Sequence, residues 1–406
     1  MNVASDGTVT EYAKYWEPQV STEFNSTKSD EDYAQELREL YIDTLRLHLI
    51  SDVPVGISLS GGLDSTGVAA ITRQLIAEKH ANLHTQKMHT FSVVYPGASM
   101  NEEDYIDIAA EFVASEKHII RPTVDAFWSE IDDWLYTQEE PTISSGPYAN
   151  YNVMREASKY VKVMLSGQGG DELFAGYIPY ITSYLQGAIK AGRFDAAARE
   201  LFKGRDLYLP YFTKLLKNRL RQKPQLRMGS LLKKDALRGH EFDYNRSDNL
   251  NVRLWEDVSR YSVPNLLRYE DKNSMAFSVE GRVPFLDHIL VEYILGLPAD
   301  QKIKHGWNRY VYRNALKGYL PEQIEKRRKK VGFTTPEADW IKAKGEHILG
   351  LFRSDEFAAV DLFDHTTVAD SFAGWLAGSL AADAMTFWRV LNLYLWARRY
   401  DVSISA

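Results

Sequence analysis

Two glycine-rich segments carry carboxylates where a phosphate site would need them. The segment SGGLDS (60–65) contains Asp64, and the segment SGQGGDE (166–172) contains Asp171. Glycines let backbone N–H groups approach an anion, and the N-terminus of a following helix adds a favourable dipole. An aspartate beside a phosphate requires an intervening cation. The two segments therefore predict a phosphate site with Mg2+ held by Asp64 and Asp171.

Either segment alone could be an ordinary strand-to-helix turn, since Ser, Gly and Asp are common turn residues. Neither segment contains the nucleotide-binding patterns GxxxxGK[ST] or GxGxxG. Both, however, follow apolar runs of strand length, VPVGISLS (53–60) and KVMLS (162–166). Such runs are typical of strands covered on both faces. Two loops of this kind in one chain favour a shared ligand site over two unrelated turns.

A parallel sheet would bring the two segments together, and the order of elements predicts one. Apolar runs alternate with amphipathic stretches over residues 31–185, which is typical of a doubly wound parallel α/β sheet. Apolar residues have helical spacing afterwards, so we expect the strands to stop near residue 180 and residues 186–406 to be helical. Residues 1–30 are polar, and we expect them to form an irregular arm. The predicted strands are 53–60, 87–97, 118–122 and 162–166. The predicted helices are 32–49, 62–79, 101–117, 125–136 and 148–161. Ser29 or Asp30 is predicted to cap the first of these helices, and Asn101 the third.

Composition excludes several classes of function. The 406 residues carry a net charge of −7 and no run of about 18 apolar residues, so neither nucleic acid nor a membrane is a predicted partner. No signal-peptide pattern is present, and a cytoplasmic location is predicted. The chain has no cysteine, which excludes disulfides, thiolate zinc sites and a cysteine nucleophile.

Other candidate features are predicted to be structural. Basic residues between positions 203 and 238 favour a solvated helical face, with a docking surface for a partner as the alternative. The aromatic residues of 387–400 have helical spacing and predict core packing. The histidines lack metal-ligand spacing, and packing or surface positions are predicted for His118, His240, His288 and His305.

Four motifs give the chain a family resemblance. SGGLDS resembles the pyrophosphate loop of the ATP pyrophosphatases, which cleave ATP between the α and β phosphates. Together with VKVMLSGQGGDELFAGY, RYEDKNSMAFSVEGRVPFLDH and RRKKVGFTTPEADW, it resembles the synthetase domain of the glutamine-dependent asparagine synthetases. The wider family includes β-lactam synthetases and lasso-peptide cyclases. The resemblance covers roughly residues 10–400 and implies an ATP-pyrophosphatase fold (adenine nucleotide alpha hydrolase-like) completed by a helical region.

The resemblance implies roles for residues at matching positions. It assigns Mg2+ binding to Asp64 and Asp171, and it matches Lys330 to a lysine that stabilises charge on phosphate and on the acyl transition state. From the residues alone, a solvated charge in the run 326–330 is the simpler interpretation of Lys330. The segment 139–152 resembles the part of the family near the acceptor pocket. The other implied ATP- and pyrophosphate-binding residues are Leu59, Ser60, Gly61, Gly62, Ser65, Val93, Ser166 and Gly167.

Two departures bear on the reaction. The asparagine synthetases carry an N-terminal glutaminase domain whose nucleophile is its first cysteine, and this sequence shows neither. Nitrogen is therefore expected from ammonia, from a separate glutaminase subunit or from another amine. Position 168 is Gln where the best-studied asparagine synthetases have Glu, and a carboxamide cannot act as a general base. Gln168 and Glu172 are candidate catalytic residues, and Glu172, Glu270 or Asp271 could supply the base.

The sequence thus predicts an ATP-dependent, AMP-forming amide ligase with ATP and Mg2+ bound. A carboxylate, with aspartate as the first candidate, would attack the α-phosphorus, and an amine would then displace AMP. One alternative is a ligase that amidates another carboxylate or closes a lactam or peptide ring. A second is a non-catalytic ATP-binding subunit. Besides the small-molecule carboxylate and amine, a glutaminase subunit and a second copy of the chain are candidate partners.

Overall fold

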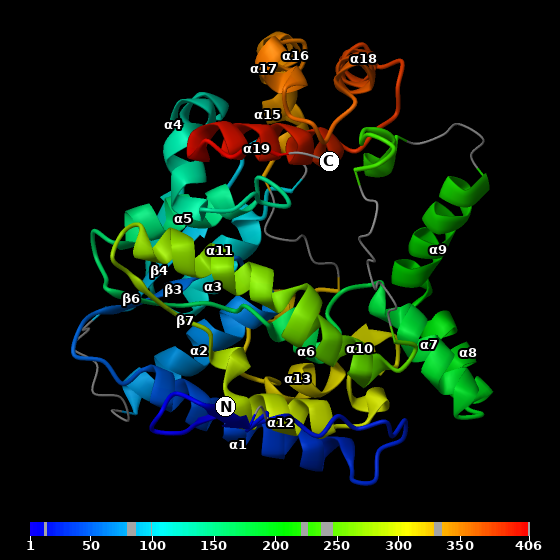
Figure 1. Ribbon diagram of the computed structural model, residues 1–406. Helices are drawn as coiled ribbons and strands as arrows, with labels where there is room; N and C mark the ends of the chain where they lie inside the picture. The colour runs from blue at the N-terminus through cyan, green and yellow to red at the C-terminus, as the bar shows by residue number, and fades with distance from the viewer. Residues whose placement is uncertain are drawn as a thin grey trace.

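A five-stranded parallel sheet forms the centre of the protein in this computed structural model (Figure 1). The structure describes residues 1–11, 14–78, 87–98, 100–220, 226–236, 247–328 and 335–404. All neighbouring strands of this sheet run parallel, and helices cover both faces, which confirms the doubly wound α/β class. In order across the sheet the strands are β5 (Glu116–Ile120), β4 (His89–Val93), β3 (Val55–Ser58), β6 (Val163–Leu165) and β7 (Glu280–Arg282).

The central strands are apolar because helices cover them on two sides. All three residues of β6 are buried, as are the first three of β3. In Figure 1 the sheet lies between an upper layer that contains α5 (Pro147–Ala157) and α11 (Val263–Met275) and a lower layer that contains α2 (Leu63–Ala77). The lower layer also contains α1 (Asp30–His48), α12 (His288–Gly296) and α13 (Tyr310–Ala315).

The expectation that strands stop near residue 180 is wrong. β7 extends the sheet at the edge beside β6, and β8 (Ile303–Lys304) pairs with β9 (Trp307–Asn308) as an antiparallel ribbon. β7 has the sequence EGR and is largely exposed, so no apolar run marked it. Its position is set by pairing with β6 rather than by its own composition. The N-terminal arm also contains a hairpin, β1 (Asn2–Val3) with β2 (Val9–Glu11).

Helix boundaries test the capping predictions. Ser29, one of the two residues predicted to cap α1, is its N-cap, and Asp32 completes a capping box. Asn101 is not a cap, because α3 begins after Glu102, whose side chain pairs with Arg327 instead. The remaining α-helices are α3 (Glu103–Phe112), α4 (Val124–Gln138), α6 (Gly170–Phe174), α7 (Tyr180–Lys190), α8 (Phe194–Lys203), α9 (Arg205–Leu220), α10 (Leu250–Glu256), α14 (Glu322–Glu325), α15 (Glu337–Ala343), α16 (Gly345–Phe352), α17 (Asp355–Ala358), α18 (His365–Leu376) and α19 (Ala384–Tyr400), with a π-helix at Asp257–Tyr261 and 3-10 turns at Met228–Ser230, Pro284–Leu286 and Ala299–Gln301.

A separate apolar cluster joins the C-terminal helices to α4. Trp388 of α19 packs on Trp134 and Phe127 of α4, and Phe387 packs on Phe372 and Trp375 of α18. The aromatic residues of the C-terminal segment thus pack in a core, as their spacing predicts. Among the described residues, no helix is long and apolar enough to cross a membrane.

Candidate active site

The order of the strands brings the two glycine-rich loops together. From β3 the chain moves outward through β4 to β5, and it then returns to β6, on the other side of β3. Strand order reverses between β3 and β6, and crevices at such points are where open α/β sheets bind ligands. The loops at 59–62 and 166–169 follow these two strands at the same edge of the sheet.

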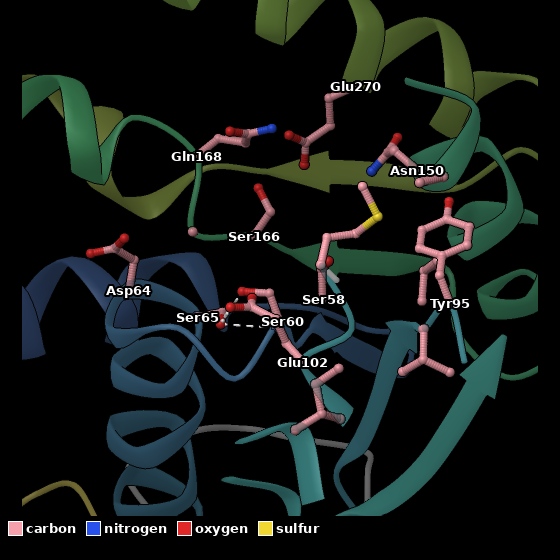
Figure 2. Close-up of a pocket in the computed structure, with 16 residues that line it drawn as sticks. Ser58, Ser60, Asp64, Ser65, Tyr95, Glu102, Asn150, Ser166, Gln168 and Glu270 are labelled. Atoms are coloured by element: carbon pink, nitrogen blue, oxygen red, sulfur yellow. Dashed lines mark hydrogen bonds between the residues drawn. The ribbon is translucent and has the colours of Figure 1, made fainter. Parts of the chain in front are cut away.

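The first loop has a geometry that only glycine fits. Gly61 has φ +67°, and a Cβ there would lie 2.6 Å from the carbonyl carbon of Tyr105. The hydroxyls of Ser60 and Ser65 lie 3.0 Å apart, and the Ser60 amide donates to the Ser65 hydroxyl (Figure 2). Gly62 precedes α2 without a side-chain cap. The loop therefore turns tightly into a helix N-terminus that can receive an anion.

The second loop packs directly against the first. Gly169 has φ +87° and lies against Leu286, so a side chain there would be strained and would clash. A Cβ at Gly170 would sit 3.0 Å from the carboxylate carbon of Asp64. The contact places Asp64, from the first loop, beside the start of α6 and therefore near Asp171.

Asp64 and Asp171 converge on one buried guanidinium. Arg309 Nη1 donates to Asp64 Oδ2 at 2.8 Å and to Asp171 Oδ1 at 3.0 Å. All three side chains are at most 5% exposed. Burial disfavours the charged form of Arg309, but the two carboxylates outweigh this effect and raise its pKa. Buried like charges this close need a cation between them, and Arg309 supplies one.

The same donor set fits Mg2+. Carboxylate oxygens are the protein ligands that Mg2+ prefers, usually one or two per ion together with substrate phosphates. Asp64 and Asp171 offer such oxygens from two loops that also present backbone N–H groups, so the ion and a phosphate chain could be held together. The predicted pairing of the two aspartates thus has a physical basis in the fold.

A cavity opens beyond the carboxyl ends of β3, β4 and β6 (Figure 2). Both loops contribute polar residues to it, as do Asn150 of α5 and Glu270 of α11, and most of its apolar wall comes from β4 and the segment after it. It is lined by Ser58, Ser60, Asp64, Ser65, Val93, Val94, Tyr95, Met100, Glu102, Ile106, Ala149, Asn150, Ser166, Gly167, Gln168 and Glu270.

Glu270 is a carboxyl group of the cavity whose pKa is shifted toward neutral pH. It extends from α11, and its carboxyl points toward the Gln168 amide and lies between Gln168 and Asn150 (Figure 2). Burial raises the pKa of Glu270 to about 7, although Ser166 and Gln168 nearby act to lower it. Neither carboxyl oxygen has a hydrogen-bond partner in good geometry. A carboxyl group of this kind can exchange a proton near neutral pH.

The structure brings most predicted residues to the cavity but separates others from it. Glu172 is buried in α6, where its carboxylate accepts hydrogen bonds from the Tyr177 and Ser262 hydroxyls. Burial raises the pKa of Glu172, and the nearby charge of Asp171 raises it further. Lys330 lies outside the described residues. Leu59, Gly61, Gly62 and Asp171 lie in or next to the loops without lining the cavity, whereas Ser60, Asp64, Ser65, Val93, Ser166, Gly167 and Gln168 line it.

Sequence reasoning missed Arg309 and part of the cavity wall. Arg309 lies 245 residues from Asp64, and no local pattern connects them. Tyr95 and Met100 follow a predicted strand, but nothing in their spacing marked them as cavity residues. Asn150 falls in the segment 139–152, which the resemblance placed near the acceptor pocket, and it does line the cavity.

Comparisons with known proteins agree with this geometry. A model of the asparagine synthase family matches residues 36–398. The chain is 26% identical over 397 residues to a glutamine-hydrolyzing asparagine synthetase (number 1) of Bacillus subtilis, covering 92% of this chain and 60% of that protein. It is 26% identical over 410 residues to asparagine synthetase 3 of the same organism (97% and 64%). It is 25% identical over 381 residues to the amidase chyE of Penicillium rubens (81% and 56%). The chain spans less than two thirds of the length of these relatives.

Replacing Arg309 should destabilise the protein strongly. We expect Arg309→Met to lower the free energy of unfolding by about 3–5 kcal/mol, because two buried carboxylates lose the guanidinium between them. Arg46→Met is the matched control, since Arg46 pairs with Asp43 at the surface and should cost less than about 1 kcal/mol. Urea denaturation measures both. Equal losses would show that the buried ion cluster contributes no more than a surface pair.

Glu270 should make stability depend on pH in a defined direction. Its pKa of about 7 in the folded protein lies above that of an unfolded glutamate, so the folded state holds more protons between about pH 4.5 and pH 7. The contribution of Glu270 to the free energy of unfolding is therefore fully present below about pH 4.5, and it is lost as the pH rises through about 7. Relative to wild type, Glu270→Gln should gain about 3 kcal/mol across this range.

Urea unfolding at several pH values measures this difference. Glu346→Gln, at an exposed position, is the control and should keep a constant difference from wild type. A constant difference for Glu270→Gln as well would contradict the raised pKa.

Proposed function

The chain belongs to the asparagine synthase family, as the match over residues 36–398 shows, and on this premise we propose that it is an ATP-dependent ligase that forms an amide with release of AMP and diphosphate. The observation that carries the proposal is the convergence of Asp64 and Asp171 from two glycine-rich loops at the strand-order reversal. ATP would bind across these loops and into the cavity that they line, and the acceptor would lie beside Asn150, Gln168 and Glu270 of the same cavity.

The first half-reaction activates a carboxylate. A carboxylate oxygen of the acceptor attacks the α-phosphorus of ATP, the bond to the β-phosphate breaks, and diphosphate leaves. Ser60, Ser65 and the N-terminus of α2 would receive the diphosphate. Mg2+, held by Asp64 and Asp171, would neutralise charge on the phosphates. Arg309 fixes the direction of both carboxylates.

The second half-reaction forms the amide. An amine attacks the acyl carbon, AMP leaves with the bonding electron pair, and the amine loses a proton. Glu270 would accept this proton, because its pKa of about 7 makes it basic enough at neutral pH. Gln168, whose amide points toward Glu270 (Figure 2), would hydrogen-bond the reacting groups. We prefer Glu270 to Glu172, which is bound to Tyr177 and Ser262 away from the cavity.

The acceptor and the amine are also proposals. Aspartate is the first candidate acceptor, since relatives are named asparagine synthetases, and the nitrogen would come from ammonia, a glutaminase subunit or another amine. Lys330 would contribute a positive charge near the phosphates. A ligase acting on another carboxylate, or closing a ring, is the second candidate. It is favoured by Gln168 in place of Glu and by the relative named an amidase.

The adenylation step can be tested by ATP–diphosphate exchange. With Mg2+ and a carboxylate panel that includes aspartate, we expect exchange that chelation by EDTA abolishes. Asp64→Asn should reduce it by about 100-fold or more, because a metal ligand and its charge are lost. Asp52→Asn, at an exposed position before β3, should leave it unchanged. ATP binding without exchange for any carboxylate would instead support a non-catalytic nucleotide-binding subunit.

The role of Glu270 can be separated from adenylation. We expect Glu270→Gln to retain exchange within a few-fold while amide formation falls by about 100-fold or more, since only the second half-reaction needs the base. Both are measured with the carboxylate that supports exchange, using ammonia as the amine. Glu346→Gln serves as the control. Equal loss of both activities, in a variant that still folds, would rule out a role confined to proton transfer.

A further inference from the structure

A cluster of potential metal ligands lies at the end of the sheet opposite the cavity. His89 begins β4 and pairs in register with Glu116 of β5, and Phe91 pairs with His118. Alternate residues of a strand share a face, so His89, Glu116 and His118 lie on the same face of two adjacent strands. Val93, at the other end of β4, lines the cavity; it is about 13 Å along the strand from His89. The cluster is therefore separate from the candidate active site.

The ligand atoms of the cluster converge. His89 Nδ1 lies 3.0 Å from His118 Nε2. One ring nitrogen of each histidine and a carboxylate oxygen of Glu116 lie within 4.8 Å of one another. Two nitrogens bound to one tetrahedral Zn2+ at about 2.0–2.1 Å are separated by about 3.3 Å. Small side-chain movements would thus place the three atoms around one ion.

Aromatic stacking holds the imidazoles in this arrangement. The His118 ring stacks on Phe91 with a centroid distance of 4.7 Å, and it lies 4.1 Å from the Tyr160 ring with the two planes tilted by 40°. His89 lies against the same two rings. The rings are partly exposed and Glu116 is exposed, so an ion could enter from solvent. The site is preorganised without being closed.

The charges around the cluster are compatible with a cation. Lys87 Nζ lies 3.6 Å from Glu116, but its side chain is exposed and can move away. Glu156, on α5, lies near enough to favour a positive charge at His118.

We propose that His89, Glu116 and His118 form a binding site for Zn2+, with water completing a four-coordinate shell. Two imidazoles with one carboxylate form a ligand set that suits Zn2+, whereas Mg2+ prefers oxygen ligands alone. Ring contacts account for the positions of the imidazoles, and a hydrogen bond between them accounts for their facing nitrogens, but neither accounts for the carboxylate of Glu116 beside them. The ion would tie β5, at the edge of the sheet, to β4. Sequence spacing missed the site because His89 and His118 lie on different strands, 29 residues apart.

Calorimetric titration of Zn2+ into the full chain, free of any histidine tag, tests the proposal. We expect one equivalent to bind to wild type and to raise the midpoint of thermal unfolding. His118→Phe keeps the aromatic stack and removes one ligand, and it should weaken binding at least tenfold. His288→Asn, at an exposed histidine, should bind as wild type does. Asp64→Asn should also retain the site, which separates it from the predicted Mg2+ position.

Two results would overturn the proposal. One is the absence of a stoichiometric Zn2+ site in wild type, which needs no variant. The other is equal affinity in wild type and His118→Phe. If His118→Phe does not fold, Glu116→Gln replaces it, because that side chain is exposed. It should weaken Zn2+ binding severalfold, and unchanged affinity would count against the site.

Discussion

The burial of two carboxylates against one guanidinium is the constraint on which the candidate active site depends. Asp64 and Asp171 come from loops more than a hundred residues apart, and Arg309 comes from a third segment. Their charges cannot be buried separately at acceptable cost, so the three segments must meet. Glycines make this approach possible, since a Cβ at Gly176 would overlap the Asp171 carboxylate and one at Gly170 would crowd the Asp64 carboxylate. The contacts among Asp64, Asp171 and Arg309 therefore both stabilise the fold and position the residues of the candidate active site.

In the reaction that we propose, the two chemical steps would use residues on different sides of the cavity. The carboxylates proposed to act on phosphate lie at the strand ends, whereas Glu270 reaches the cavity from α11, in the opposite helix layer. Burial keeps Glu270 near its point of half-protonation at neutral pH. In our proposal, one wall of the cavity stabilises charge and the other moves a proton. Gln168 lies between them and carries no charge, so it leaves the acidity of Glu270 to be set mainly by burial.

Local patterns in the sequence predicted the elements that depend on local forces. The cap at Ser29, the buried strands β3 and β6 and both glycine loops follow from neighbouring residues. Features that depend on distant residues were not predicted. β7 is a strand only because β6 pairs with it, and Arg309 is a site residue only because the fold carries it to Asp64. Glu270 was one of three candidate bases, and burial beside Gln168 distinguishes it.

The central claim is that a carboxylate attacks the α-phosphorus of ATP. The most direct test uses the acceptor carboxylate that supports exchange, labelled with 18O, followed by mass spectrometry of the nucleotide after turnover with an amine. Attack at the α-phosphorus predicts one labelled oxygen in AMP, because the acyl-adenylate leaves that oxygen on the phosphate when the amide forms. Label in inorganic phosphate together with formation of ADP would contradict the account.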